Sequence, residues 1–166
     1  MTIGKISKKS KLIIGWREWC ALPDLAVPGI AAKIDTGAKT SSLHAYKIEP
    51  FIRDSQQWVK FRVHPIQRRR RPEILCEAPV VDKRAVTSSN GETEQRFVIS
   101  TTLVLGAHRF TTEITLTNRD EMGYRMLVGR QSLNQRFVVD PSLSLTTGDY
   151  EEHELYPAQQ STQGSL

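Results

Sequence analysis

The residue best placed to do chemistry in this chain is Asp35. It ends an apolar run and is followed at once by Thr36 and Gly37. Two carboxylates held a few ångströms apart share one proton, because like charges at that distance do not both ionise. One of the pair can then take a proton from water while the other donates to a carbonyl oxygen, which hydrolyses a peptide bond without a metal. We therefore take Asp35 as a candidate catalytic residue.

Thr36 and Gly37 suit a loop that carries such a carboxylate. Gly37 allows close backbone approach and turn angles that other residues avoid, and the Thr36 hydroxyl can lock the loop by hydrogen bonding across a two-fold axis. Asp-Thr-Gly also makes ordinary strand-ending turns, so the tripeptide alone is a weak signal. It occurs once, in a chain without internal repeats. A second carboxylate would have to come from a second copy of the chain.

The elements that must position Asp35 are predicted to be short strands. Apolar and polar residues alternate with the period of a half-buried strand, and Asn90-Gly91 is a strong hairpin signal. The expected strands span Leu12–Cys20, Gly29–Ile34, Ser42–Ile52, Trp58–His64, Val80–Val86, Arg96–Leu105 and His108–Thr117. One short helix is expected around Gln131–Arg136. The pattern predicts a small all-β barrel or sandwich.

Composition indicates one soluble globular domain, with 39% hydrophobic and 25% charged residues in 166. Cys20 and Cys76 have no metal-like spacing and are expected to be reduced thiols. The apolar run Leu12–Ile14 is too short for a signal peptide or a membrane span, so a cytoplasmic protein is expected, without a membrane partner. We expect a basic extension over residues 1–11, a domain over 12–156 and a disordered tail over 157–166.

A second motif lies downstream, where Leu127 and Val128 precede Gly129-Arg130. In the order Asp35–Ala38, the Asn90-Gly91 hairpin and Leu127–Arg130, the chain resembles the retroviral-type aspartic proteases, or retropepsins. The resemblance implies a closed or partly open barrel of the acid protease fold with one short C-terminal helix. It also implies a homodimer with one aspartate per subunit, a flap tipped by Asn90 and Gly91, and an active-site wall of Leu127, Val128 and Gly129.

The resemblance narrows to one bacterial group. With residues 33–45, 117–119 and 126–130, the chain is similar to a bacterial retropepsin-like family often labelled ATP-dependent zinc protease. Members of this family are associated with ATP-grasp ligases that add glutamate tails to proteins, including ribosomal protein S6. The implied activity is the opposing one, namely trimming of poly-α-glutamate tails. A functional link to such a ligase follows.

The label itself does not fit the residues. A zinc protease needs three ligands, commonly with two histidines at helical spacing, and no two of His44, His64, His108 and His153 are spaced in that way. ATP use would require a phosphate-binding loop such as G-x-x-x-x-G-K, which does not occur. We therefore expect no metal, no ATP and no other cofactor, and assign the ATP to the ligase.

The charge of the chain agrees with an acidic substrate. The net charge is +5 and the pI is about 9.4, and arginine can grip carboxylates through two hydrogen bonds. The candidate substrate-binding residues are Lys39, Arg96, Arg119 and Arg130. Each can equally be a solvated or structurally paired side chain. Arg130 has a further alternative, since in retropepsins this arginine supports the dimer by ion pairing, so Lys39 and Arg96 rank first.

The run Arg68–Arg71, bounded by Pro65 and Pro72, is either a solvated loop or an electrostatic docking site. The leading hypothesis is a homodimeric aspartic peptidase that cleaves acidic or glutamylated tails. One alternative is a catalytically inactive retropepsin-like module that binds such tails. Another is a basic β-barrel that binds RNA through the arginine run. Only 7% of residues are aromatic and none lies inside the run, which disfavours RNA as a partner.

Overall fold

The computed structural model describes residues 10–88, 90–118 and 123–157, and within them the chain is built mainly from strands. The strands are β1 (Leu12–Ile14), β2 (Arg17–Leu22), β3 (Val27–Ile34), β4 (Ser41–His44), β5 (Tyr46–Arg53), β6 (Gln56–Val63), β7 (Ile74–Thr87), β8 (Thr93–Leu105), β9 (His108–Thr117), β10 (Met126–Val128) and β11 (Phe137–Val139). The helical segments are η1 (Pro23–Leu25), α2 (Arg130–Leu133) and α3 (Glu152–Leu155).

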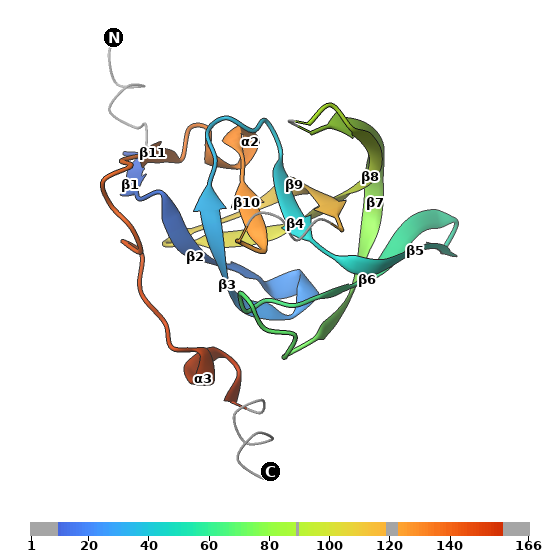
Figure 1. Ribbon diagram of the computed structural model, residues 1–166, viewed down its shortest axis with the longest axis horizontal. Coiled ribbons are helices and arrows are strands. Elements are labelled where there is room, and N and C mark those ends of the chain that lie inside the picture. The colour runs from blue at the N-terminus through green and yellow to red at the C-terminus, as the bar shows by residue number, and fades with distance from the viewer. Residues whose placement is uncertain (1–9, 89, 119–122, 158–166) are drawn as a thin grey trace.

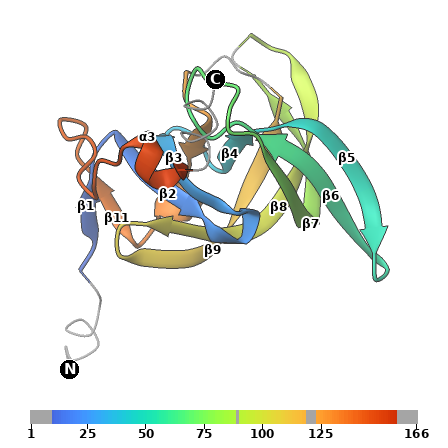
Figure 2. The ribbon, with the colours of Figure 1, turned by 90° about the horizontal axis from the view of Figure 1, so that it is seen from below.

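Six of the strands close into a ring. Their order is β2-β3-β10-β4-β9-β8, and β2 returns to β8 through the pairing of Ala21 with Val104. The sheet continues from β8 through β7 to the β5–β6 hairpin, which projects from the barrel in both ribbon views (Figures 1 and 2). The strands β1 and β11 form a separate parallel pair. The expected all-β, barrel-like fold is confirmed.

The barrel interior is filled by the inward-facing residues of these strands. In β6, Val59, Phe61 and Val63 are fully buried while their neighbours are partly exposed, as the alternation predicts. Cys20 and Cys76 are buried free thiols, and burial raises the pKa of each to about 12. Both cysteines therefore belong to the core.

The prediction of one strand over Leu12–Cys20 is wrong, because the chain breaks at Gly15 between β1 and β2. The Gly15 N–H turns to the carboxylate of Glu18, and a Cβ on Gly15 would lie 2.1 Å from the Leu143 carbonyl oxygen. The break is thus set by a segment more than a hundred residues away. This contact has no local signature in the sequence.

The prediction of one strand over Ser42–Ile52 is also wrong. The strand β4 ends at His44, and the Ala45 N–H donates to the Thr117 carbonyl at 2.9 Å. The chain then enters β5 and reverses into β6 through Asp54 and Ser55, both with positive φ. Two adjacent residues in this conformation suit a tight hairpin.

The helices are shorter and more numerous than expected. The segment predicted around Gln131–Arg136 is the single turn α2, since Gln135 adopts a φ of 69° and turns the chain toward β11. The sequence did not indicate α3, which a capping box of Glu151 and Glu154 begins. No helix in the described ranges is long and apolar enough to cross a bilayer. The proposed boundaries at residues 11 and 156 stay a prediction.

Glu18 ties the C-terminal segment to the start of the barrel. Its side chain is fully buried and accepts hydrogen bonds from the backbone N–H groups of Gly15, Thr146 and Thr147 at 2.7–3.1 Å, and from both threonine hydroxyls. Burial opposes ionisation, but these donors outweigh it and lower the pKa of Glu18. A carboxylate so surrounded stabilises the fold in its ionised form.

Replacing Glu18 with glutamine should lower the free energy of unfolding by about 2 kcal/mol, because an amide NH2 would face several N–H donors. Since the folded pKa lies below the unfolded value of 4.5, the contribution is present above pH 4.5 and is lost as pH falls through the folded pKa. Urea denaturation between pH 3 and 7 measures both effects. Glu49→Gln, at an exposed ion pair with Lys60, is the control, and equal small losses in both variants would contradict the role.

Candidate functional site

The loop that carries Asp35 arches over the end of β10. This strand lies between the strands that enter and leave the loop, parallel to β3 and antiparallel to β4. The Asp35 N–H donates to the Val128 carbonyl at 2.9 Å. The two sequence motifs, far apart in the chain, are thus joined directly.

Gly129 is required by the closeness of this crossing. A Cβ at this position would lie 2.7 Å from the Thr40 carbonyl carbon and 3.0 Å from the Ala38 oxygen. Immediately afterwards, the N–H groups of Arg130 and Gln131 donate to the carbonyls of Ala38 and Lys39 at 2.8 and 3.0 Å. The expected wall is therefore in contact with the loop, with Val128 and Gly129 buried and Leu127 partly buried.

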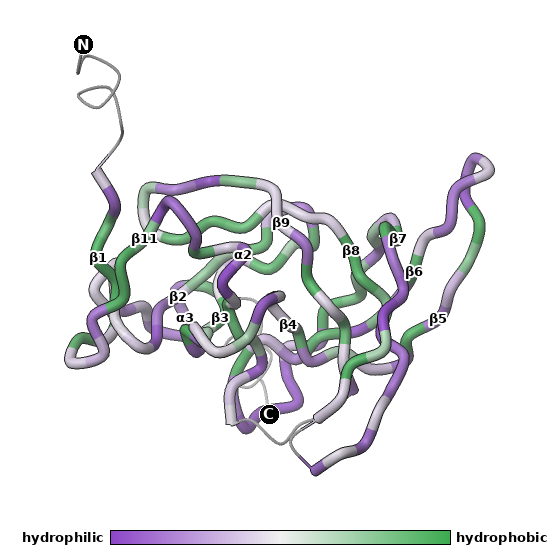
Figure 3. The backbone as a smooth tube through the Cα atoms, turned by 90° about the horizontal axis from the view of Figure 1, so that it is seen from above, coloured by the Kyte–Doolittle hydropathy of each residue, from purple (hydrophilic) through white to green (hydrophobic). Residues whose placement is uncertain are grey.

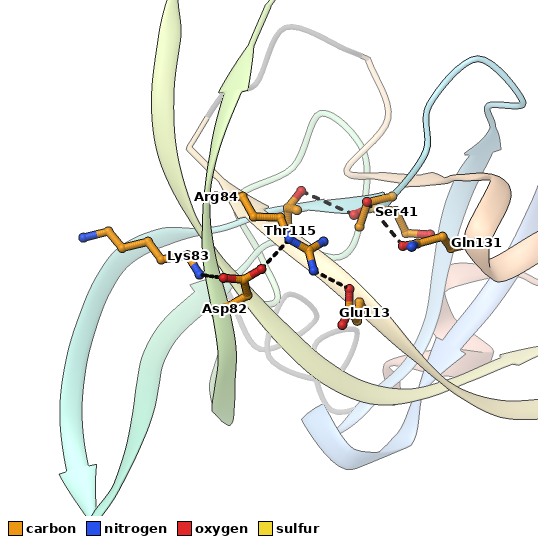
Figure 4. Close-up of polar contacts among 8 residues, drawn as sticks. Ser41, Asp82, Lys83, Arg84, Glu113, Thr115 and Gln131 are labelled. Carbon is orange, nitrogen blue, oxygen red and sulfur yellow. Dashed lines mark hydrogen bonds and ion pairs between the residues drawn. The ribbon is translucent and has the colours of Figure 1, made fainter.

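Buried hydroxyls fasten the loop from below. The Gly129 N–H donates to Ser41 Oγ at 2.9 Å, Ser41 Oγ lies 2.7 Å from Ser132 Oγ, and Ser132 Oγ lies 2.8 Å from Thr112 Oγ1. Ser41 and Ser132 are fully buried. Figure 4 shows a neighbouring contact, in which the Thr115 hydroxyl donates to the Ser41 carbonyl oxygen at 3.3 Å. No sequence motif indicated this chain of hydroxyls, although the polar residues in apolar strand positions were an available signal.

Asp35 itself is half-buried, whereas Thr36 and Gly37 are exposed. The Gly37 N–H donates to Asp35 Oδ1 at 3.0 Å, which holds the carboxylate in an Asx-type turn. On the other side of the loop, Arg130 Nη1 donates to the Thr36 carbonyl at 3.0 Å. The carboxylate is thus fixed in direction and open to solvent on one side.

Beside the loop lies a hollow of about 600 Å³. Thr36, Lys39 and Arg130 line one side of it, and Phe137 and Val139 of β11 line another. Lys39 is exposed, while Arg130 braces the loop as described. Asp35 is not part of the lining, so the hollow adjoins the carboxylate rather than enclosing it.

The Asn90-Gly91 turn, which the sequence predicts to tip a flap, joins the long strands β7 and β8 in a hairpin. At its tip the Ser88 N–H donates to the Glu92 carbonyl at 2.8 Å, and Gly91 has a φ of 86°. Asn90 Oδ1 accepts from the Glu92 N–H at 3.1 Å. Asn90 and Gly91 are exposed, and the tip lies at the same end of the molecule as the β3–β4 loop (Figure 1).

Two arginines lie directly opposite each other on this hairpin, Arg84 on β7 and Arg96 on β8. Arg96 pairs with Glu94 at 2.5 Å and has a side chain only 13% exposed. Arg84 pairs with Asp82 at 2.6 Å and with Glu113 at 2.8 Å (Figure 4). Arg96 was a sequence candidate, whereas Arg84 was missed, although alternation in β7 could have indicated it.

Two other expectations concern Arg119 and a metal site. Arg119 lies outside the described residues. In the ranges that the structure describes, no three His, Cys, Asp or Glu side chains group to hold a metal ion.

Comparison with known proteins identifies what the chain is similar to. Residues 13–149 match the family model described as RimB-like, "Retropepsin-like aspartic endopeptidase RimB". A crystal structure of a Legionella pneumophila protein of unknown function (DUF785) superposes with a TM-score of 0.70 at 30% identity, covering 83% of this chain and 99% of that one.

Curated relatives carry a different name. A "Probable alpha-L-glutamate ligase" of Shewanella halifaxensis is 48% identical over 160 residues, which cover 95% of this chain and 35% of the relative. One of the same name from Parasynechococcus marenigrum is 50% identical over 145 residues, covering 87% and 31%. The chain therefore spans about a third of the length of these relatives.

The contact at Gly129 gives a prediction. Gly129→Ala should lower the free energy of unfolding by about 1–3 kcal/mol, because the new methyl group meets backbone that cannot move aside. Gly29→Ala is the matched control, since its Cβ would meet the flexible tip of the Leu155 side chain. Chemical denaturation compares the two variants. A loss at Gly129 no larger than that at Gly29 would contradict the tight crossing.

Proposed function

The chain belongs to the RimB-like family of retropepsin-like aspartic endopeptidases, and we propose that it is a homodimeric aspartic peptidase with one Asp35 from each subunit. The observation that supports this most is the Asp35 loop, held on β10 and Gly129 with its carboxylate fixed by Gly37. A rigid loop presents the carboxylate in one direction, as catalysis by two converging carboxylates requires.

In this proposal the two Asp35 side chains share one proton. The ionised carboxylate takes a proton from the attacking water, and the protonated one donates to the carbonyl oxygen of the substrate. As the tetrahedral intermediate collapses, one carboxyl donates its proton to the leaving amine while the other carboxylate takes the hydroxyl proton of the intermediate, which restores the shared state. The apparent pKa values belong to the pair, so activity is expected to follow a bell-shaped pH profile.

The surface beside the loop supports a second copy as partner. Ile13 of β1 and Val138 of β11 are paired in register and are 55% and 48% exposed, and Figure 3 shows both strands as apolar. Their neighbours Phe137 and Val139 line the same hollow as Thr36. An apolar strand pair next to an incomplete site is suited to a two-fold interface, since the same patch would meet itself.

The basic residues near the loop and on the flap support an acidic substrate, for which we propose glutamylated protein tails. Arg84 and Arg96 form ion pairs with Glu113 and Glu94. On binding, carboxylates of the substrate would replace these glutamates as partners of the two arginines. Lys39 is exposed beside the loop. The name of the relatives, glutamate ligase, agrees with a protein that removes what such a ligase adds.

Asp35→Asn should abolish trimming of a glutamate-tailed protein, because an amide cannot share the proton. The fold and the binding of the tail should survive, since asparagine keeps the shape and the acceptor for the Gly37 N–H. Intact mass measures trimming, and fluorescence anisotropy measures binding by the variant. Trimming that persists would contradict the shared-proton mechanism, while binding by a wild-type protein that never trims would favour the inactive binding module.

Arg84→Gln should raise the KM for glutamate tails roughly ten-fold, because a hydrogen bond between charged groups contributes about 1.5–3 kcal/mol. Arg53→Gln is the control, since Arg53 forms a similar ion pair with Glu77 at 2.8 Å on the β5–β6–β7 sheet. Steady-state kinetics on one tailed substrate compares them. An unchanged KM in Arg84→Gln, or an equal rise in both, would remove Arg84 from substrate recognition.

A further inference from the structure

A second hollow, of about 490 Å³, lies where the C-terminal ends of β4, β6 and β9 come together. It is lined by His44, Tyr46, His64, Arg68, Arg70, Asn118 and Arg125, and we call it the cationic hollow. We propose that it binds side-chain carboxylates of an acidic peptide at a distance from the scissile bond. The proposal rests on the function proposed above and extends the substrate site beyond the catalytic loop.

The charge of the lining supports this ligand. Three arginines face the hollow, and none of the described residues that line it is acidic. Burial and the neighbouring Arg125 lower the pKa of His64, so the positive charge of the lining comes from the arginines. The adjacent carboxylate, Glu73, is engaged by the Tyr46 hydroxyl and by Arg62 at 2.5 Å, and these hydrogen bonds lower its pKa. Carboxylates are the ligands that clustered guanidinium groups bind best among peptide side chains.

The walls of the hollow are held in place. The rings of Tyr46 and His64 stack with centroids 4.6 Å apart. Arg125 is 6% exposed, and its Nη2 lies 3.4 Å from the Arg69 carbonyl oxygen. The Gln67 amide donates to the Gly123 carbonyl, which joins the arginine segment to the segment before β10. Fixed side chains reduce the entropy lost when a ligand binds.

The hollow also assigns a role to the arginine run that the catalytic loop leaves unexplained. Arg68 and Arg70 line it, whereas Arg69 and Arg71 do not. Arg69 instead pairs with Glu152 at 2.9 Å. Arg68 and Arg70 therefore face a different surface from Arg69. This arrangement is expected of a specific site and not of a loop that is merely basic.

The separation from the catalytic loop fits a peptide. Ser41 lies under the loop and His44 lines the hollow, three residues further along β4, which is about 10 Å at the rise of a strand. The same spacing occurs at β10. Val128, at its end, contacts the loop, and Arg125, which lines the hollow, lies three residues earlier, just before the strand begins. In this proposal an extended tail runs along β4 from the catalytic loop and advances at the same rise per residue, so a side chain several residues from the scissile bond would reach the hollow.

The test measures binding by anisotropy, using labelled peptides with three or eight consecutive glutamates and protein carrying Asp35→Asn. On that background, Arg68→Gln/Arg70→Gln should weaken binding of the long peptide roughly ten-fold and leave the short peptide nearly unchanged. Arg69→Gln/Arg71→Gln removes the same charge from the same run and should bind both peptides as the parent does. Circular dichroism checks that all three proteins are folded.

Several outcomes would overturn the proposal. If the two double variants weaken binding of the long peptide equally, the effect comes from net charge rather than from the hollow. If Arg68→Gln/Arg70→Gln weakens binding of the short and the long peptide alike, the hollow is not a separate site at a distance from the scissile bond. If the first double variant lost binding of a labelled single-stranded RNA and kept the long peptide, the hollow would be part of a nucleic-acid surface. Wild-type protein that fails to trim while the peptide binding pattern holds would overturn the peptidase proposal alone.

Discussion

The structure of the site depends on one close crossing, that of β10 beneath the Asp35 loop. The loop has no regular structure of its own, so its shape is set by what it touches. Gly129 permits the approach to Thr40 and Ala38, and the N–H groups that follow satisfy the loop carbonyls. Because the strands before and after the loop both pair with β10, the carboxylate cannot be displaced without disturbing the barrel.

The chain supplies one carboxylate of this kind to the proposed site. The Asp35 carboxylate is half-exposed and accepts the Gly37 N–H, and the Asp-Thr-Gly sequence occurs once. The catalytic proposal therefore needs two subunits, and the apolar β1–β11 pair beside the loop offers a surface for them. In the same proposal, the arginines of the β7–β8 hairpin and of the cationic hollow extend the surface that an acidic peptide would contact. Recognition would then be spread over many carboxylates, while bond cleavage stays at a single position.

Much of this arrangement could be predicted from the sequence, because it is encoded in short motifs. The strand alternation predicted a barrel or sandwich, and the resemblance to retropepsins carried by Leu127–Arg130 implied a wall near Asp35. Features set by distant partners could not be predicted. The break at Gly15 comes from Leu143, and the buried Glu18 meets Thr146 and Thr147. The contacts of Ser132 with Ser41 and of Arg84 with Glu113 likewise join segments far apart in the chain, which local composition does not report.

The most direct measurement of the central claim is a subunit-mixing titration. A fixed amount of wild-type protein exchanges subunits with rising amounts of Asp35→Asn protein, and trimming of a glutamate-tailed protein is followed by intact mass. If each site needs an aspartate from both subunits, activity should fall to about half at equal amounts and toward zero in excess, since random pairing leaves that share of wild-type chains in homodimers. Activity that stays constant at every ratio would contradict a catalytic site shared between two chains.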